Sequence, residues 1–328
     1  MRKNSVERER KATFIFYLWF ISTTELMSQV TGHETWGVVY NSVGSLRAEP
    51  RHAAEMVTQV LLGMPVKIYE QQGEWCMIET PERYVGWISG SVQLLTDRQR
   101  RNYLQQPKVI ISALYARSYS LPYQISQPVS DLVAGNMLEL IMDDGVYYRV
   151  RYPDGRRAYV MKSNAKELHD WLREISLTGE SIVQTATQLL GIPYLWGGTS
   201  VKGLDCSGFI KQVYFMHGII LARDASQQVR SGKLVDETGD LTNALPGDLL
   251  FFGAKASEEV GEKVVHVGIY LGKRRFIHAS DYVRINSFDP ADPLYDEFNA
   301  NRYLRTKRII GEVPGEGIEQ IFSNAFYR

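Results

Sequence analysis

The helical pattern that begins at Cys206 is the most informative feature of this chain. Apolar residues recur at Phe209, Ile210, Val213 and Tyr214, a spacing that places them on one face of an α-helix. We expect the helix to start at the cysteine and to bury this face. The sulfur would then lie at the helix N-terminus.

Upstream of this helix, residues 166–190 also have helical periodicity. Two successive apolar stripes, with Thr178 or Ser181 as possible N-caps, predict helices that pack on a core. The first stripe consists of Leu168, Trp171, Leu172 and Ile175, and the second of Ile182, Val183, Ala186, Leu189 and Leu190. We assign these stripes no chemistry.

Downstream, the pattern changes to the alternation of apolar and polar residues that is typical of β-strands. Strands are predicted near 249–253, 264–271, 275–280, 282–287 and 307–310. Helices followed by a run of antiparallel strands predict an α+β fold. Within the run, a hairpin that turns near Gly272 would place His266 and His278 directly opposite each other on one face.

The segment before the helices contains an internal repeat with an offset of 72 residues. A shared offset across three separate strands predicts two copies of one small β module. The charged residues 97–101 between the copies predict a solvated linker. The matching segments are 63–68 with 135–140, 75–78 with 147–150, and 86–88 with 158–160.

Length and charge limit the possible classes of function. A chain of 328 residues suits two or three domains. Lysine and arginine together number 37, as do aspartate and glutamate, so the formal net charge is zero. This balance gives no support to binding of nucleic acid or of an anionic membrane surface. We therefore predict no nucleic-acid partner.

The N-terminal residues predict export. Basic residues up to Lys11 precede the apolar run 12–21, which is the layout of a signal peptide and is too short for a comfortable membrane span. We predict a signal peptide at 1–28, a periplasmic or extracellular protein, and no stable membrane span after removal of the signal. A short uncleaved anchor is the alternative.

One cysteine and two histidines suggest nucleophilic catalysis. A thiol at a helix N-terminus lies at the positive end of the helix dipole, which favours the nucleophilic thiolate. We expect Cys206 to attack, His266 to accept and return the proton, and His278 to hold His266 in the useful tautomer. Taken alone, each of these residue types is more often a buried structural side chain.

Two other uses of these side chains remain open. Cys206, His266 and His278 could bind zinc, although their spacing lacks the closely spaced ligand pairs of structural zinc sites. An exported chain could also pair Cys206 with Cys76, the other cysteine, but a disulfide would silence the proposed nucleophile. We therefore expect no metal and no other cofactor.

Five motifs along the chain together resemble the NlpC/P60 family of cysteine peptidases. The resemblance covers about residues 178–312 and implies a papain-like catalytic domain within the α+β class. It implies that Cys206 is the nucleophile, His266 the base and His278 the third member. Members of the family hydrolyse cell-wall peptides, typically at the bond after γ-linked D-glutamate. The motifs lie at 194–198, 205–208, 245–252, 266–270 and 277–279.

The same resemblance implies roles for further residues near the nucleophile. The Tyr194 hydroxyl would help to stabilise the oxyanion, together with the backbone N–H of the nucleophile. Positions that match Asp205, Ser207 and Asp224 help to bind the N-terminal dipeptide of the substrate in the family. Ala225 takes the place where close relatives often have a serine.

The two repeat copies resemble bacterial SH3-like barrels, the second more weakly than the first. The resemblance therefore implies two small all-β SH3-like barrels before the catalytic domain. In a subgroup with this arrangement, the first barrel supplies an acidic residue and a tyrosine that select a free N-terminal amine. By position, Glu55 and Tyr84 match these two residues.

These observations lead to one predicted function and two alternatives. The leading hypothesis is a cysteine endopeptidase or dipeptidyl-peptidase that cleaves the γ-D-glutamyl-L-diamino acid bond of peptidoglycan-derived peptides, such as L-Ala-γ-D-Glu-diaminopimelate with a free N-terminus. The alternatives are a wall-lytic endopeptidase on intact peptidoglycan and a non-catalytic peptidoglycan-binding protein. The oligomeric state stays open. The predicted parts are the signal peptide 1–28, the barrels 36–97 and 104–165, a helical linker 166–180, the peptidase domain 181–312 and a C-terminal tail 313–328.

Overall fold

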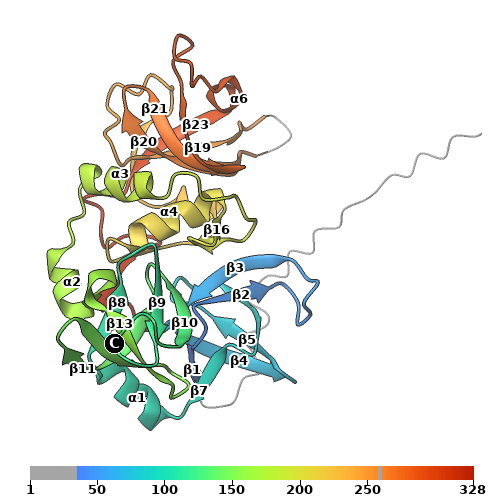
Figure 1. Ribbon diagram of the computed structural model, residues 1–328. Coiled ribbons are helices and arrows are strands. Elements are labelled where there is room, and N and C mark those ends of the chain that lie inside the picture. Colours follow the sequence, from blue (N-terminus) through green and yellow to red (C-terminus); the bar gives the residue numbers. More distant parts are fainter. Residues whose placement is uncertain (1–34, 258–260) are drawn as a thin grey trace, which may run out of the picture. The chain divides into compact units, whose positions relative to one another are not determined.

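The computed structural model describes residues 35–257 and 261–328 (Figure 1). Within these residues, two seven-stranded sheets are followed by helices and a six-stranded sheet. The predicted signal peptide at 1–28 lies outside the described residues. No helix in the described part of the chain is both long enough and apolar enough to cross a membrane.

The first sheet forms a small antiparallel barrel, in which strands with alternating burial enclose an apolar core. The core includes Val39, Leu46, Val60 and Ile78, all with no exposed surface. The strand order is β3-β2-β6-β5-β4-β1-β7. The strands are β1 (Thr35–Val39), β2 (Val43–Arg47), β3 (Met56–Leu61), β4 (Pro65–Gln72), β5 (Trp75–Glu79), β6 (Val85–Ser89) and β7 (Val92–Leu95).

The second sheet has the same topology as the first. Its order, β10-β9-β13-β12-β11-β8-β14, repeats the first order with every strand number raised by seven. The predicted duplication of one β module is therefore confirmed. The strands are β8 (Lys108–Ile111), β9 (Tyr115–Tyr119), β10 (Pro128–Val133), β11 (Met137–Asp144), β12 (Tyr147–Arg151), β13 (Arg157–Met161) and β14 (Ala165–Glu167), with the 3-10 turn η2 (Lys162–Asn164) before β14.

The connection between the barrels at 97–101 is solvated, as predicted, and it is also helical. Helix α1 (Asp97–Gln105) starts after Thr96, whose hydroxyl accepts a hydrogen bond from the Gln99 N–H at 3.3 Å. The Gln99 side chain in turn accepts from the Thr96 N–H at 2.9 Å. This capping box satisfies two N–H groups of the first turn and offsets the cost of ordering a charged segment.

The remaining residues form an α+β region, as predicted. Its antiparallel sheet has the order β18-β23-β19-β20-β21-β22. Its helices are α2 (Leu168–Glu174), α3 (Gly179–Gln188), α4 (Cys206–Phe215), α5 (Ala225–Gln228) and α6 (Glu297–Asn301). Its strands are β15 (Thr199–Ser200), β16 (Gly203–Leu204), β17 (Ile219–Leu221), β18 (Lys233–Asp236), β19 (Leu249–Ala254), β20 (Lys263–Gly272), β21 (Arg275–Ser280), β22 (Tyr282–Ser287), β23 (Tyr303–Arg308) and β24 (Ile318–Gln320), the last followed by the 3-10 turn η3 (Ile321–Ser323).

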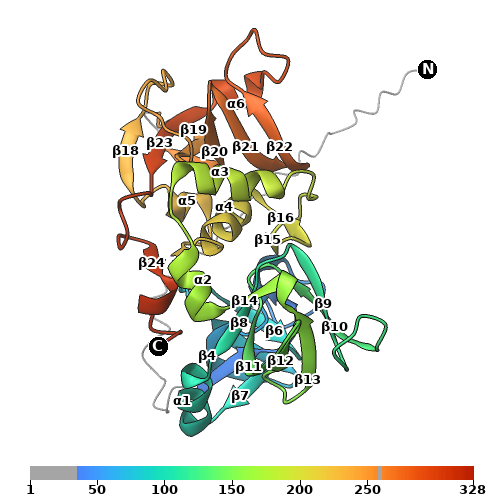
Figure 2. The ribbon, with the colours of Figure 1, turned by 60° about the vertical axis from the view of Figure 1, so that its left-hand side comes forward.

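Helix α4 packs on this sheet through the apolar face that its sequence predicts. Phe209, Ile210, Val213 and Tyr214 have no exposed surface and share one core with residues of β20 and β21, including Val267. Figure 2 shows α3, α4 and α5 gathered on one side of the six-stranded sheet. The packing brings the N-terminus of α4 to β20.

The β20–β21 hairpin turns one residue later than predicted. Ile269 pairs with Ile277 and Gly272 with Arg275, so the two-residue turn is Lys273-Arg274. Continuing the Ile269–Ile277 register away from the turn places Gly268, rather than His266, opposite His278. The prediction that the two histidines face each other directly is therefore wrong. They are diagonal neighbours on one face, which still lets long side chains meet.

Candidate active site

The nucleophile candidate is the first residue of α4. Asp205 caps the helix, because its carboxylate accepts a hydrogen bond from the Gly208 N–H at 2.7 Å. Gly208 allows the helix tip to lie close to the preceding loop, since a Cβ there would come within 1.9 Å of the Gly198 carbonyl oxygen. Cys206 is half-buried, and both it and Cys76, a residue of β5, are free thiols.

The sulfur of Cys206 lies against the backbone of β20. The backbone N–H groups of Val267 and Ser207 both interact with it and favour its ionised form. Burial is the larger effect, and the Asp205 carboxylate adds to it, so that the pKa of the thiol rises to about 11. The helix start does favour the thiolate, through the Ser207 N–H, as predicted, but burial outweighs it and the net pKa of the thiol is raised. The free protein holds Cys206 as a thiol.

The two histidines form one hydrogen-bonded chain with an asparagine. His266 Nε2 lies 2.7 Å from His278 Nδ1, and His278 Nε2 lies 2.8 Å from Asn286 Oδ1. The Asn286 amide nitrogen donates to the Leu294 carbonyl at 3.2 Å, which identifies Oδ1 as the acceptor in the other bond. His278 therefore carries its proton on Nε2 and accepts on Nδ1. His266 must donate from Nε2, which leaves its Nδ1 free to act as a base.

Both imidazoles are buried and neutral. His266 is 7% exposed and His278 has no exposed surface. Burial lowers the pKa of His278 to about 4 and holds the pKa of His266 well below 6.5, where proximity to His278 lowers it further. A neutral pair suits a general base, because Nδ1 of His266 keeps its lone pair at neutral pH.

A buried arginine next to the nucleophile is the main feature that the sequence analysis missed. Arg223 is 2% exposed and forms a two-pronged ion pair with Asp205. Its Nη1 also donates to the Ser207 hydroxyl at 2.9 Å, and its Nε donates to the Thr58 hydroxyl of β3 at 2.9 Å. Asp205 and Ser207 thus hold Arg223 in the structure, and their contact with substrate stays a prediction.

The two predicted tyrosines both reach this network. Tyr194 forms a parallel β-bridge with Leu204, two residues before Cys206, and desolvation, with a smaller effect of the Cys206 side chain, raises the pKa of Tyr194 to about 12. Tyr84, from the turn before β6, donates a hydrogen bond to Asp224, and burial with that carboxylate raises its pKa to about 12. Ala225, the first residue of α5, is buried. The structure therefore brings Tyr84 and Asp224 together across the barrel contact.

Glu55 of the first barrel also meets the nucleophile region. Its carboxylate accepts a hydrogen bond from the indole N–H of Trp196 at 2.7 Å. Nearby, the Gln59 side chain accepts from the Thr199 N–H at 3.0 Å and from the Ser200 hydroxyl at 2.8 Å. The first barrel is thus in direct contact with the loop that precedes the nucleophile.

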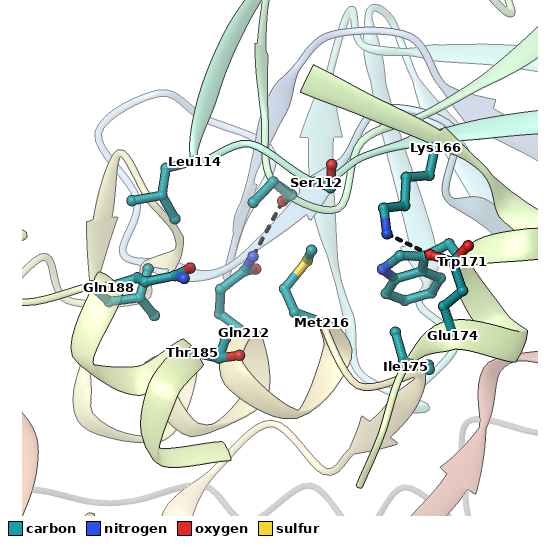
Figure 3. A pocket seen from close by; sticks show the side chains of 12 residues that line it. Ser112, Leu114, Lys166, Trp171, Glu174, Ile175, Thr185, Gln188, Gln212 and Met216 are labelled. Carbon is teal, nitrogen blue, oxygen red and sulfur yellow. Dashed lines mark hydrogen bonds and ion pairs between the residues drawn. The ribbon is translucent and has the colours of Figure 1, made fainter. Parts of the chain in front are cut away.

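A separate cavity of about 200 Å³ lies between the second barrel and helices α2, α3 and α4 (Figure 3). Gln212 of α4 lines it and donates to the Ala134 carbonyl at 3.2 Å. The cavity walls contain none of the predicted site residues. The described residues contain no group of three or more His, Cys, Asp or Glu side chains placed to hold a metal ion.

Comparisons with known proteins agree with this arrangement. The NlpC/P60 family model matches residues 191–308, and the model of the bacterial dipeptidyl-peptidase SH3 domain matches residues 46–91. Dipeptidyl-peptidase 6 of Lysinibacillus sphaericus is 31% identical over 79% of this chain and 93% of that protein. The chain belongs to the NlpC/P60 family. Its predicted fold class, an NlpC/P60 domain preceded by SH3-like β structure, and its predicted enzyme class, a cysteine peptidase, are confirmed.

Two further proteins extend the likeness. A gamma-D-glutamyl-L-lysine dipeptidyl-peptidase of Bacillus subtilis is 34% identical over 68% of this chain and 71% of that protein. The crystal structure of an NlpC/P60 family protein from Bacillus cereus matches with a TM-score of 0.71 and 24% identity, covering 84% of this chain and 99% of that one. This second likeness shows that the two proteins share a fold across both the barrels and the catalytic region.

Proposed function

We propose that this NlpC/P60 protein hydrolyses the γ-D-glutamyl-L-diamino acid bond of released cell-wall peptides that have a free N-terminus. The observation that carries the proposal is the His266–His278–Asn286 chain, because it leaves Nδ1 of His266 free. His266 directly precedes Val267, whose backbone N–H contacts the Cys206 sulfur. The names of two relatives, dipeptidyl-peptidase 6 and gamma-D-glutamyl-L-lysine dipeptidyl-peptidase, support this substrate class.

The proposed reaction follows from these protonation states. His266 Nδ1 takes the proton of the Cys206 thiol as the sulfur attacks the γ-carbonyl carbon of D-glutamate. The Cys206 N–H and the Tyr194 hydroxyl stabilise the oxyanion. When the C–N bond breaks, the imidazolium returns its proton to the leaving amine, and the acyl group stays on the sulfur as a thioester. Water, deprotonated by His266, then hydrolyses the thioester and restores the thiol.

We further propose that the first barrel recognises the substrate's N-terminal amine. Glu55 and the Tyr84–Asp224 pair place two carboxylates and a hydroxyl near the nucleophile loop. Asp224 already lies 4.0 Å from Arg223, so it is Glu55 whose carboxylate would gain a cation from a free amine and would have none beside an acylated one. This is the reason to prefer free peptides over intact peptidoglycan as substrates.

We propose the boundaries 36–97 and 104–165 for the barrels and 181–312 for the peptidase domain, with 166–180 as a helical linker and 313–328 as a C-terminal tail. Part of this tail, β24, pairs with β17. We also propose export to the periplasm or the outside of the cell, on the basis of the signal-like residues 1–28.

The decisive experiment compares the free tripeptide L-Ala-γ-D-Glu-L-Lys with its N-acetylated form, with products identified by mass spectrometry. We expect the wild type to release the dipeptide L-Ala-D-Glu from the free form alone. The Cys206→Ala protein should release none while it melts at a similar temperature. Glu55→Gln should raise KM for the free tripeptide. Clearing of purified sacculi without cleavage of either tripeptide would favour the wall-lytic alternative and contradict the proposal.

A further inference from the structure

Arg302 lies near the catalytic histidine, although no motif of the sequence marks it. It directly precedes β23, where Tyr303 pairs with Phe252 of β19. Phe252 in turn pairs with His266 of β20, and the two rings are 5.6 Å apart. The Arg302 carbonyl accepts a hydrogen bond from the Gly253 N–H at 2.8 Å, which holds the start of β23 against β19. Arg302 is therefore placed two strands away from the catalytic base.

The guanidinium of Arg302 is held in one orientation by neutral groups. Its Nε and Nη2 both donate to Asn299 Oδ1, at 2.9 and 2.7 Å. The ring of Phe298 lies 4.3 Å from the guanidinium carbon. Asn299 itself is positioned by Asp296, which caps α6. An aromatic ring and an amide thus fix the arginine before any ligand arrives, which lowers the entropic cost of binding.

This positive charge has no counter-ion in the described part of the chain. Among residues 35–257 and 261–328, no carboxylate lies within ion-pair distance of Arg302, and Nη1 has no hydrogen-bond acceptor. Asp296 acts on it electrostatically without an ion pair, and both oxygens of Asp296 accept from Asn299. Partial burial lowers the pKa of Arg302, since the cation has lost part of its hydration.

In the proposed reaction, the leaving amino acid is the part of the substrate that lies on the same side of the site as Arg302. The imidazolium of His266 has to hand its proton to the leaving amine, so the leaving amino acid occupies the His266 side of the site. Arg302 and Arg284 both act electrostatically on His266, and Arg302 also acts on Cys206. Arg284 is ion-paired with Asp281 at 3.3 Å, which leaves Arg302 as the unpaired cation of the two.

We propose that Arg302 binds a carboxylate of the diamino acid that leaves in the reaction. This inference rests on the proposed function. Two carboxylates have the required chemistry: the α-carboxylate of a C-terminal diamino acid, and the second carboxylate of a diamino acid such as diaminopimelate. Either one would complete the open edge of the guanidinium with charge-assisted hydrogen bonds. An ammonium group in the same place would be repelled.

The test uses four peptides of the form L-Ala-γ-D-Glu-X and the Arg302→Gln protein. X is L-lysine, L-lysine amide, diaminopimelate, or diaminopimelate amidated on its second carboxyl group. The readouts are KM and kcat for each peptide, with thermal melting as a check of folding. Arg274→Gln is the matched control, because Arg274 lies at the hairpin turn and its guanidinium donates only to the backbone carbonyls of Asp240 and Gly239.

We expect Arg302→Gln to lower kcat/KM by about ten- to a hundredfold for peptides that carry the recognised carboxylate, mainly through KM. A loss for lysine but not for lysine amide identifies the α-carboxylate. A loss for diaminopimelate but not for its amidated form or for lysine identifies the second carboxylate. An equal loss for all four peptides, or no loss for any, overturns the proposal. Arg274→Gln should change none of the four values by more than twofold.

Binding measurements separate this inference from the proposed function. The Cys206→Ala protein should bind the carboxylate form of a peptide at least tenfold more tightly than its amide, as measured by calorimetry, and adding Arg302→Gln should remove the difference. This result supports the role of Arg302 even if the wild type cleaves no peptide. Equal binding of acid and amide by the Cys206→Ala protein, together with normal cleavage by the wild type, contradicts the role of Arg302 alone.

Discussion

At the scale of the single residue, the environment of the Cys206 sulfur opposes ionisation. Burial and the Asp205 carboxylate raise the pKa of the thiol, and the Arg223 guanidinium offsets only part of this effect. The neighbouring imidazoles are neutral, because burial lowers their pKa values. The site therefore holds a thiol and a neutral base, and the proton has to move during the attack.

This balance predicts slow alkylation of Cys206 at neutral pH. With the pKa of the thiol at about 11, the thiolate fraction, and hence the iodoacetamide rate, should rise about tenfold per pH unit between pH 7 and pH 10. Asp205→Asn keeps a helix-capping side chain but removes the negative charge, so it should lower the pKa and speed alkylation at pH 8 at least severalfold. Both proteins are measured in a Cys76→Ala background, which leaves one thiol.

A rate that is already constant from pH 6 to pH 9 would contradict this prediction. It would mean that the free protein holds a thiolate paired with an imidazolium instead of two neutral groups. An Asp205→Asn protein that reacts no faster than its parent would show that burial alone controls the thiol. Loss of the ion pair with the buried Arg223 should also lower the stability of this variant, which urea unfolding measures.

The reacting side chains could be predicted from local sequence, whereas their partners could not. Cys206 precedes an amphipathic run, and His266 and His278 lie on neighbouring predicted strands, so all three are marked by pattern. Asn286 and Arg223 are marked by nothing local. They matter because the fold places Asn286 beside His278 and Arg223 beside Asp205, and no periodicity reports such contacts.

At the scale of the element, turn conformation decides the register of the hairpin. Lys273 and Arg274 have φ angles of 50° and 58°, a left-handed conformation that suits the tight turn but that side chains of this kind seldom adopt. Gly272 was the more plausible turn residue from sequence alone. The existence of the hairpin could therefore be predicted, but its register, and with it the diagonal placement of the histidines, could not.

The observed register predicts that Gly268→Ala impairs catalysis more than stability. A Cβ at this position of β20 would lie 3.1 Å from the Ile277 carbonyl oxygen and 3.2 Å from the Cβ of His278. The strand would have to shift His278, which orients the base. We expect a loss of about 1–2 kcal/mol in unfolding free energy and a fall of about tenfold or more in kcat.

Gly145→Ala is the matched control for this variant. Gly145 has a φ of 65° and open space around it, so an alanine there is strained but touches nothing. It should cost about 1 kcal/mol in unfolding free energy and leave kcat unchanged. If the two variants lose kcat to the same extent, the effect of Gly268→Ala is a general loss of stability and the close approach to His278 has no role.

At the scale of the whole molecule, the first barrel and the peptidase region form one buried network. Thr58, Gln59 and Glu82 of the barrel meet Arg223, Thr199 and Lys211 of the catalytic region. The repeat and the peptidase motifs could be predicted separately because each is encoded within a continuous segment. The contact between them could not, because it depends on polar side chains scattered over both segments with no common spacing.

The last prediction concerns the ion pair that crosses this contact. Lys211 Nζ of α4 lies 2.9 Å from the Glu82 carboxylate, and the two side chains are only 10% and 2% exposed. Removal of one partner leaves a buried charge unpaired, so Lys211→Met or Glu82→Gln should each cost about 3–5 kcal/mol in unfolding free energy. The double variant should cost clearly less than the sum of the two single variants, as measured by urea unfolding.

The control cycle, Lys166→Met with Glu174→Gln, concerns an exposed pair at 2.5 Å and should show a coupling of about 0–1 kcal/mol. The hydrogen bond from Trp196 to Glu55 crosses the same contact between the barrel and the peptidase region. The single variants at Lys211 and Glu82 should therefore also raise KM for the free tripeptide. A coupling as small as that of the control, with KM unchanged, would mean that the barrel is an appended module and that the peptidase region forms its site without it.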